Sequence, residues 1–231
     1  MAQRETGEQQ AYRMFLASVP NHRMIVLKDE GLYRHIRFQK PGTSIYRFDL
    51  VTWPGHLVVT GDLQDYHFAR IPDMFDFFDK KPGYVNPHYW AEKLVGHHQL
   101  HMRYSSDRFK QRVFEYFREW DPGRVHERHA DLWKAIREEL LDDAEVLDEN
   151  EAHRRLQEFR FRFDADTFEF IDSWEWDLRE FDHHFLVSLH AIVWGIHQYR
   201  TQPHKTELDW SREDHARTRA ELANLKAYHN V

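Results

Sequence analysis

The chain has 231 residues, of which 41% are hydrophobic and 31% are charged, a composition typical of a folded globular protein. It contains no cysteine, which excludes disulfides, zinc–thiolate sites and a cysteine nucleophile. The formal net charge is −7. General binding to nucleic acid or to anionic lipid is therefore disfavoured, because both need a cationic surface.

Residues 1–22 are predicted to form a polar arm with a short helix around residues 12–17. The first ten residues have no apolar segment of the kind that a secretory signal needs. No apolar run approaches the roughly 18 residues of a membrane span. We therefore expect a cytoplasmic protein that does not contact a membrane.

Residues 23–70 have the pattern of β-strands separated by turns. Apolar and polar side chains alternate over 32–38 and 45–53, and the turn formers of 41–44 and 53–55 come between successive runs. Strands joined by such short connections are antiparallel neighbours. The segment is predicted to be an antiparallel β-meander of four to five strands.

Residues 71–231 are predicted to be mostly helical. Asp121-Pro122 and Asp148 have the chemistry of helix starts, and a charged helix is expected over 213–228. Residues 174–199 are predicted to form a central helix, because they are apolar nearly all round between Phe185 and Ile196. The fold class is therefore α+β, with a single domain over 1–231 in which the meander packs against the helical C-terminal region.

An acidic-aromatic stretch lies at 164–182. It holds eight acidic side chains and one basic one, a net of −7 that equals the excess negative charge of the whole chain. Large rings, such as Phe168, Trp174 and Trp176, alternate with the acids. The candidate binding residues are Asp166, Glu169, Asp172, Glu175, Trp176, Asp177 and Glu180.

Three interpretations of this stretch are open. A negative surface with aromatic rings can engage a basic partner. Clustered carboxylates can instead hold Mg²⁺ or Mn²⁺, although no metal-binding spacing is met here. The third interpretation is a solvated helix start, where acids suit the helix dipole.

The chain has 18 histidines, and some have spacings that can chelate a metal. His97 and His101 are four residues apart, and His126 and His129 are three apart. A further set lies at seven-residue intervals on the predicted central helix: His183, His190 and His197. No HExxH motif is present, and such spacings arise by chance among so many histidines, so we expect structural or surface roles, no metal site and no cofactor.

Polar residues near the strand ends form another candidate site. A general acid/base pair could be assembled from Asp49, Asp62, Asp65, His67 and the neighbours Arg34 and His35. The alternative is that Asp62 and Asp65 form turn hydrogen bonds, while Asp49 pairs with an arginine across the sheet. Glycine-rich phosphate-binding motifs and GxSxG are absent from the sequence.

Several segments together resemble a family of phage- and prophage-encoded proteins. They are GLYRHIRF (31–38), PGTS (41–44), FDLVTWPG (48–55) and TGD (60–62), followed by RIPDMFDFF (70–78), WAEK (90–93) and the region 168–199. The resemblance implies a phage or prophage context, hence the cytoplasm of a bacterial host. It implies no activity and no catalytic residues.

The sequence therefore favours a phage-encoded accessory protein that binds a host macromolecule, plausibly to inhibit a defence system. The expected partner is a host protein with a basic surface, contacted through 164–182. Two alternatives are a metal-dependent enzyme acting on nucleotides or phosphodiesters, and a virion or scaffold component. Whether the protein is catalytic, and whether it forms a homo-oligomer, is left open by the sequence.

Overall fold

The computed structural model describes residues 6–96, 101–120, 128–163 and 167–228. Contacts divide the chain into two compact units, which are described separately. Unit 1 consists of Met1–His101 and Phe181–Val231, and unit 2 is Met102–Glu180. The single domain over 1–231 stays a prediction, because this division describes contacts and not cooperative unfolding.

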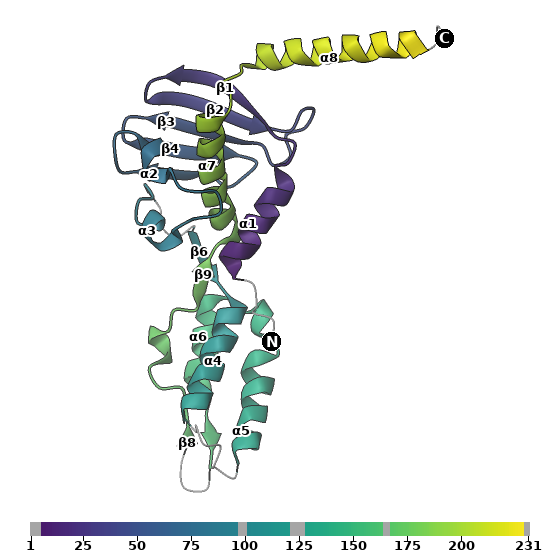
Figure 1. The fold of residues 1–231 in the computed structure, drawn as a ribbon. Helices are drawn as coiled ribbons and strands as arrows, with labels where there is room; N and C mark the ends of the chain where they lie inside the picture. The colour runs from purple at the N-terminus through teal and green to yellow at the C-terminus, as the bar shows by residue number, and fades with distance from the viewer. Residues whose placement is uncertain (1–5, 97–100, 121–127, 164–166, 229–231) are drawn as a thin grey trace. The chain divides into compact units, whose positions relative to one another are not determined.

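Unit 1 is built on a five-stranded antiparallel sheet in which sequential strands are neighbours (Figure 1). The strands are β1 (Arg23–Glu30), β2 (Tyr33–Gln39), β3 (Phe48–Trp53), β4 (His56–Gly61) and β5 (Tyr66–Ala69). The segments 41–44 and 53–55 connect β2 to β3 and β3 to β4, as the turn chemistry predicts. The predicted meander is confirmed, with five strands.

One face of the sheet is covered by α7 (His183–Thr201), which crosses it in Figure 1. Alternate strand residues, such as Ile36, Phe38 and Leu50, are fully buried in the core of this unit. Gly195 lets the helix approach closely, because a Cβ atom there would lie 2.8 Å from Cδ1 of Leu50. The layer of sheet and helix buries the aromatic core that the composition requires.

The predicted start of this central helix at residue 174 is wrong. Its first turn is capped by the carboxylate of Asp182, which accepts hydrogen bonds from the backbone N–H groups of His184 and Phe185 at 2.9 and 3.2 Å. The chain just before this cap is extended, in β9 (Arg179–Phe181). The acids of 164–180 are therefore not the start of α7.

The described residues of unit 1 form four more α-helices: α1 (Gly7–Ser18), α2 (Met74–Phe78), α3 (Pro87–Ala91) and α8 (Glu207–Tyr228). The helix predicted over 213–228 begins earlier than expected, at Glu207. Trp210 near its start donates an indole hydrogen bond to the carbonyl oxygen of Met24 at 2.8 Å. This contact holds the first turns of α8 on β1.

Unit 2 is mostly helical and has its own aromatic core. It contains α4 (Ser106–Trp120), α5 (His129–Ile136), a π-helical turn (Arg137–Leu141), a 3₁₀ turn (Ala144–Val146) and α6 (Glu149–Glu158). Its described residues also form two small two-stranded sheets, β6 (Met102–Tyr104) with β9 and β7 (Phe161–Arg162) with β8 (Thr167–Phe168), and the second pair is antiparallel.

The helix starts expected in this unit have different outcomes. Asp148 caps α6 as predicted, accepting a hydrogen bond from the backbone N–H of Glu151 at 2.8 Å. The start expected at Asp121 lies outside the described residues.

An N-terminal antiparallel sheet followed by a mostly helical region confirms the α+β fold class. In the described ranges, no helix combines the length and the apolar character needed to cross a bilayer.

Candidate functional site

The described part of the acidic-aromatic stretch up to Glu180 belongs to unit 2. After β8 the chain passes through a 3₁₀ turn at Ser173–Glu175 and then enters β9. Asp166 lies outside the described residues. We call residues 171–177 the acidic loop, because they combine three acids with two exposed apolar side chains.

The rings of the stretch divide between the core and the surface. Phe168 and Phe170 are buried, and Trp176 is half-buried beside Phe170 and Tyr116, with ring centroids 5.8 and 5.5 Å away. By contrast, Trp174 leaves 62% of its surface exposed. Of the two loop tryptophans, Trp174 therefore faces solvent and Trp176 mainly packs unit 2.

Ile171 joins Trp174 on the surface, with 60% of its surface exposed. Between these two residues, Asp172 adopts a left-handed backbone with φ of 53°. This conformation is uncommon for residues other than glycine, although aspartate tolerates it better than most. The backbone reversal at Asp172 places two large apolar side chains in water within four residues.

Hydrogen bonds hold the acidic loop at its beginning and its middle. The backbone N–H of Ile171 donates to the hydroxyl of Tyr116 at 3.1 Å, and that hydroxyl donates to the carbonyl of Glu169 at 3.2 Å. The carbonyl of Ser173 lies 3.1 Å from Nδ1 of His153. Ser173 itself is buried. The loop is thus fixed on α4 and α6, and its exposed side chains are presented by a constrained backbone.

The carboxylates of the candidate residues are of two kinds. Three are engaged: Glu169 pairs with Arg160 at 2.8 Å, Asp177 pairs with Arg179 at 3.1 Å, and Glu180 accepts from the hydroxyl of Ser105 at 2.6 Å. The other two, Asp172 and Glu175, are exposed and have no side-chain partner in the described parts of the chain.

The partners of these carboxylates determine the pKa of Asp177 and the negative charge that the loop presents to solvent. Burial opposes the ionisation of Asp177, but hydrogen bonds from Arg179 outweigh it and lower the pKa of this carboxyl. Asp172 and Glu175 lie on either side of Trp174 and supply uncompensated negative charge. The loop is therefore an apolar anchor flanked by free carboxylates.

In unit 1, the sheet face opposite α7 carries a second group of polar side chains. The buried carboxylate of Asp49 accepts hydrogen bonds from Nε2 of His35 at 2.7 Å and from Arg37 at 2.9 Å. Burial opposes ionisation of Asp49, but these two bonds outweigh it and lower the pKa of the carboxyl. The pairing of Asp49 with an arginine across the sheet, one of the two alternatives, is confirmed.

The other strand-end residues do not join this group. Arg34 lies on the opposite face and makes two hydrogen bonds of 2.8 Å to Asp73, the cap of α2. Asp62 accepts a hydrogen bond at 2.6 Å from the backbone N–H of Tyr46, which lies in the connection before β3, so this bond joins two connections and is not the local turn hydrogen bond expected. The six candidate residues are therefore not brought together as one acid/base site.

His56 and His67 form a pair on the sheet face that carries Asp49, and the sequence analysis did not predict this pair. Nδ1 of His56 in β4 lies 3.0 Å from Nε2 of His67 in β5, and Trp53 packs against both rings with centroids 4.9 and 5.2 Å away. The two histidines are eleven residues apart, which is no recognisable ligand spacing. Only the predicted pairing of adjacent strands could have indicated their proximity.

The histidine sets singled out by spacing are dispersed or outside the described residues. Along α7, His190 is buried, His183 is half-buried and His197 is exposed, so the three face different surroundings. His97 and His126 lie outside the described residues. Among those that are described, no group of three or more histidine, aspartate or glutamate side chains is placed to hold a metal ion.

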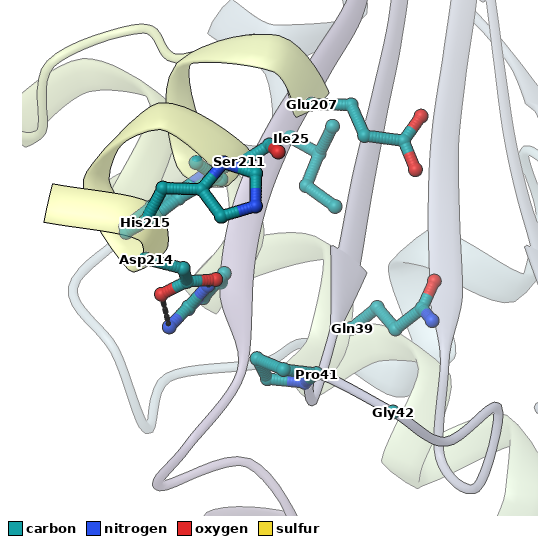
Figure 2. Close-up of a pocket in the computed structure, with 10 residues that line it drawn as sticks. Ile25, Gln39, Pro41, Gly42, Glu207, Ser211, Asp214 and His215 are labelled. Carbon is teal, nitrogen blue, oxygen red and sulfur yellow. Dashed lines mark hydrogen bonds and ion pairs between the residues drawn. The ribbon is translucent and has the colours of Figure 1, made fainter. Parts of the chain in front are cut away.

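A cleft of about 370 Å³ lies between the start of α8 and the ends of β1 and β2 (Figure 2). Its floor includes Ile25, and Glu207 projects into it from α8. Arg23 and Asp214 in its wall form two hydrogen bonds of 2.7 and 2.8 Å with each other. This ion pair of the cleft therefore joins α8 to β1.

Comparison with known proteins supplies no relative from which a function could be transferred: no family model, curated protein or solved structure matches the chain.

Proposed function

We propose that this protein acts by binding a host protein that presents a basic surface, and that the acidic loop is the contact. The observation that carries the proposal is the exposure of Ile171 and Trp174 beside the free carboxylates of Asp172 and Glu175. Large exposed apolar side chains surrounded by a rim of polar side chains are typical of protein interfaces.

The physical argument concerns what each part of the loop contributes to binding. Burying an exposed tryptophan or isoleucine removes apolar area from water, and tryptophan is enriched among residues that dominate binding energy. Carboxylates on the rim raise the association rate with a basic partner and discriminate against acidic ones. The hydrogen bonds at Ile171 and Ser173 reduce the ordering cost of binding, because the loop backbone is already constrained.

The biological setting is part of the same proposal. The resemblance to phage- and prophage-encoded proteins supports a role in a bacterial host. Accessory proteins of phages often act on host proteins, and the proposed action here is to occupy a surface of a defence protein.

Affinity capture from a bacterial host tests the proposal with a matched pair of variants. Ile171→Ala shortens an apolar residue of the acidic loop, and Ile45→Ala shortens a similarly exposed isoleucine of unit 1, 60% against 64%. We expect wild type and Ile45→Ala to recover the same protein, which has a basic surface, and Ile171→Ala to recover less of it. Recovery that depends on Ile45 and not on Ile171 would overturn the assignment.

A charge-reversal pair tests the electrostatic half of the proposal. Glu175→Lys changes a free carboxylate of the acidic loop, and Asp65→Lys changes an exposed carboxylate of unit 1. We expect Glu175→Lys to slow association with the captured protein and to weaken its salt dependence, because exposed charges are screened beyond about 10 Å at 0.1 M salt. Equal association rates for the two variants would count against a basic partner surface.

A further inference from the structure

The histidine pair of unit 1 has the separation of two donor atoms on one metal ion. A metal bound at about 2.0–2.1 Å to two imidazoles at a right angle places their nitrogens about 2.9 Å apart, and a tetrahedral angle places them about 3.3 Å apart. The observed separation between Nδ1 of His56 and Nε2 of His67 is 3.0 Å. The pair thus fits cis positions of a tetragonal or octahedral ion better than a tetrahedral one.

The position of the two rings is fixed by the sheet and by a neighbour. His56 and His67 are diagonal neighbours on β4 and β5, since His56 is opposite Ala69 and His67 is opposite Val58. Trp53 stacks on His56 with an interplanar angle of 21° and contacts His67 at 48°. Packing of this kind restricts rotation of both rings, as outer partners do in metal sites.

The two rings are also accessible to an ion from solvent. Both rings are half-buried and keep part of their surface in solvent. An ion can therefore reach them, and water can complete its coordination.

We propose that His56 and His67 form a two-histidine site for one Cu²⁺ or Ni²⁺ ion, with water in the remaining positions. These ions prefer imidazole in a tetragonal arrangement, and copper binds such donors more tightly than other divalent ions of its row. On binding, the N–H···N hydrogen bond between the rings is replaced by two metal–nitrogen bonds. The proton of the donating nitrogen moves to the other nitrogen of the same ring through solvent, so no net proton is released.

Titration of the full chain with CuSO₄ at pH 7.5, followed by calorimetry and by electron paramagnetic resonance, tests this site. Wild type should bind one equivalent more tightly than the rest, with an axial spectrum that shows nitrogen coupling. His56→Gln and His67→Gln should each lower the affinity for the tightly bound copper ion by at least about tenfold. Even the loss of a residue that only hydrogen-bonds a metal ligand can lower metal affinity by this factor.

The matched control is His35→Gln. His35 lies on the same sheet face, is about one-third exposed, and is hydrogen-bonded to Asp49 and not to either histidine of the pair. It should retain the tight equivalent, which separates the pair from background binding by the other histidines. Thermal unfolding of each metal-free variant confirms that it is folded. A tight equivalent unchanged in both pair variants, or lost equally in His35→Gln, would overturn the proposal. This site is independent of the acidic loop, so neither result bears on the proposed function.

Discussion

Nε2 of His190 in α7 lies 3.3 Å from the carbonyl oxygen of Glu8 in α1, and the ring of Tyr12 packs 4.9 Å from the imidazole. Nδ1 of His190 is buried and has no hydrogen-bond partner in the described ranges. Nε2 therefore carries the hydrogen and donates a hydrogen bond to the carbonyl oxygen of Glu8, while Nδ1 is unprotonated. A neutral histidine joins the two helices.

We predict that His190 lowers the free energy of unfolding at acidic pH. Burial lowers the pKa of His190 to about 4, from an ordinary value of 6.5. As pH falls between these two values, the unfolded chain takes up a proton before the folded chain does, so folding is disfavoured by up to about 3 kcal/mol. Urea unfolding should show a smaller difference between pH 7 and pH 4.5 for His190→Leu than for wild type.

The comparison with wild type isolates this residue. The pKa values of His22, His67 and His183 are also lowered by burial, and they act in the same direction in both proteins. Their contributions cancel in the difference between the two pH dependences. An identical acid sensitivity in His190→Leu would show that His190 is not the group responsible.

The carboxylate of Asp49 should stabilise the sheet. Asp49→Asn keeps the size of the side chain but removes its charge, leaving His35 and Arg37 without their anion. We expect a loss of about 1–2 kcal/mol at pH 7, since both partners are about one-third exposed and can regain water. Asp65→Asn, which changes an exposed acid, serves as control in the same denaturant titration.

The effect should also depend on pH. Because the folded-state pKa of Asp49 is lowered, its contribution is present above its ordinary value of 3.8 and disappears as pH falls through the lowered value. The stability difference between Asp49→Asn and wild type should therefore shrink below pH 4. A difference that stays constant down to pH 2 contradicts the ion-pair explanation.

Gly61 at the end of β4 is predicted to be intolerant of any side chain. Its φ is 130°, and a Cβ atom there would lie 2.5 Å from the carbonyl oxygen of Arg47 and 3.0 Å from Cα of Phe48. Both contacts are with backbone, so neither can be relieved by a side-chain rotation. Gly61→Ala should cost about 2 kcal/mol or more of unfolding free energy. Gly42→Ala, which has open space around it, is the control and should cost less.

The two tryptophans of the acidic loop should differ in what they stabilise. Trp176 packs on the core of unit 2, and Arg112 lies 5.4 Å above its ring. Trp176→Ala should therefore lower the unfolding free energy by about 2–3 kcal/mol. Trp174→Ala should change it by no more than about 0.5 kcal/mol, because the ring is 62% exposed. Chemical denaturation measures both, and equal losses would contradict the assigned positions.

Local patterns predicted much of unit 1 from the sequence. Apolar and polar side chains alternate in 32–38 and 45–53, with turn-forming residues between the two segments. This alternation indicates strands, because alternate side chains of a strand lie on the same face of a sheet. The burial of Phe185 to Ile196 followed equally from their continuous apolar character. The start of α7 lies nine residues later than predicted, at His183, because the chain before its cap Asp182 is extended in β9.

The sites were predicted less well, because they depend on tertiary placement. Alternating acids and rings in 164–182 identified a stretch of interest. The same pattern could not separate exposed Trp174 from half-buried Trp176, since the left-handed residue at Asp172 interrupts any regular period. The contact between His56 and His67 comes from the pairing of β4 with β5, and no spacing along the chain encodes it.

The most direct test of the acidic loop as a binding surface is site-specific photo-crosslinking in bacterial cells. A photoreactive phenylalanine analogue replaces Trp174 in one protein and Ile45 in another, two positions that are 62% and 64% exposed. If the acidic loop is the contact, a covalent adduct with one cellular protein forms from position 174, is absent from position 45, and is reduced when Glu175→Lys is added. An adduct that forms only from position 45, or none from position 174 while the captured partner is bound, would contradict it.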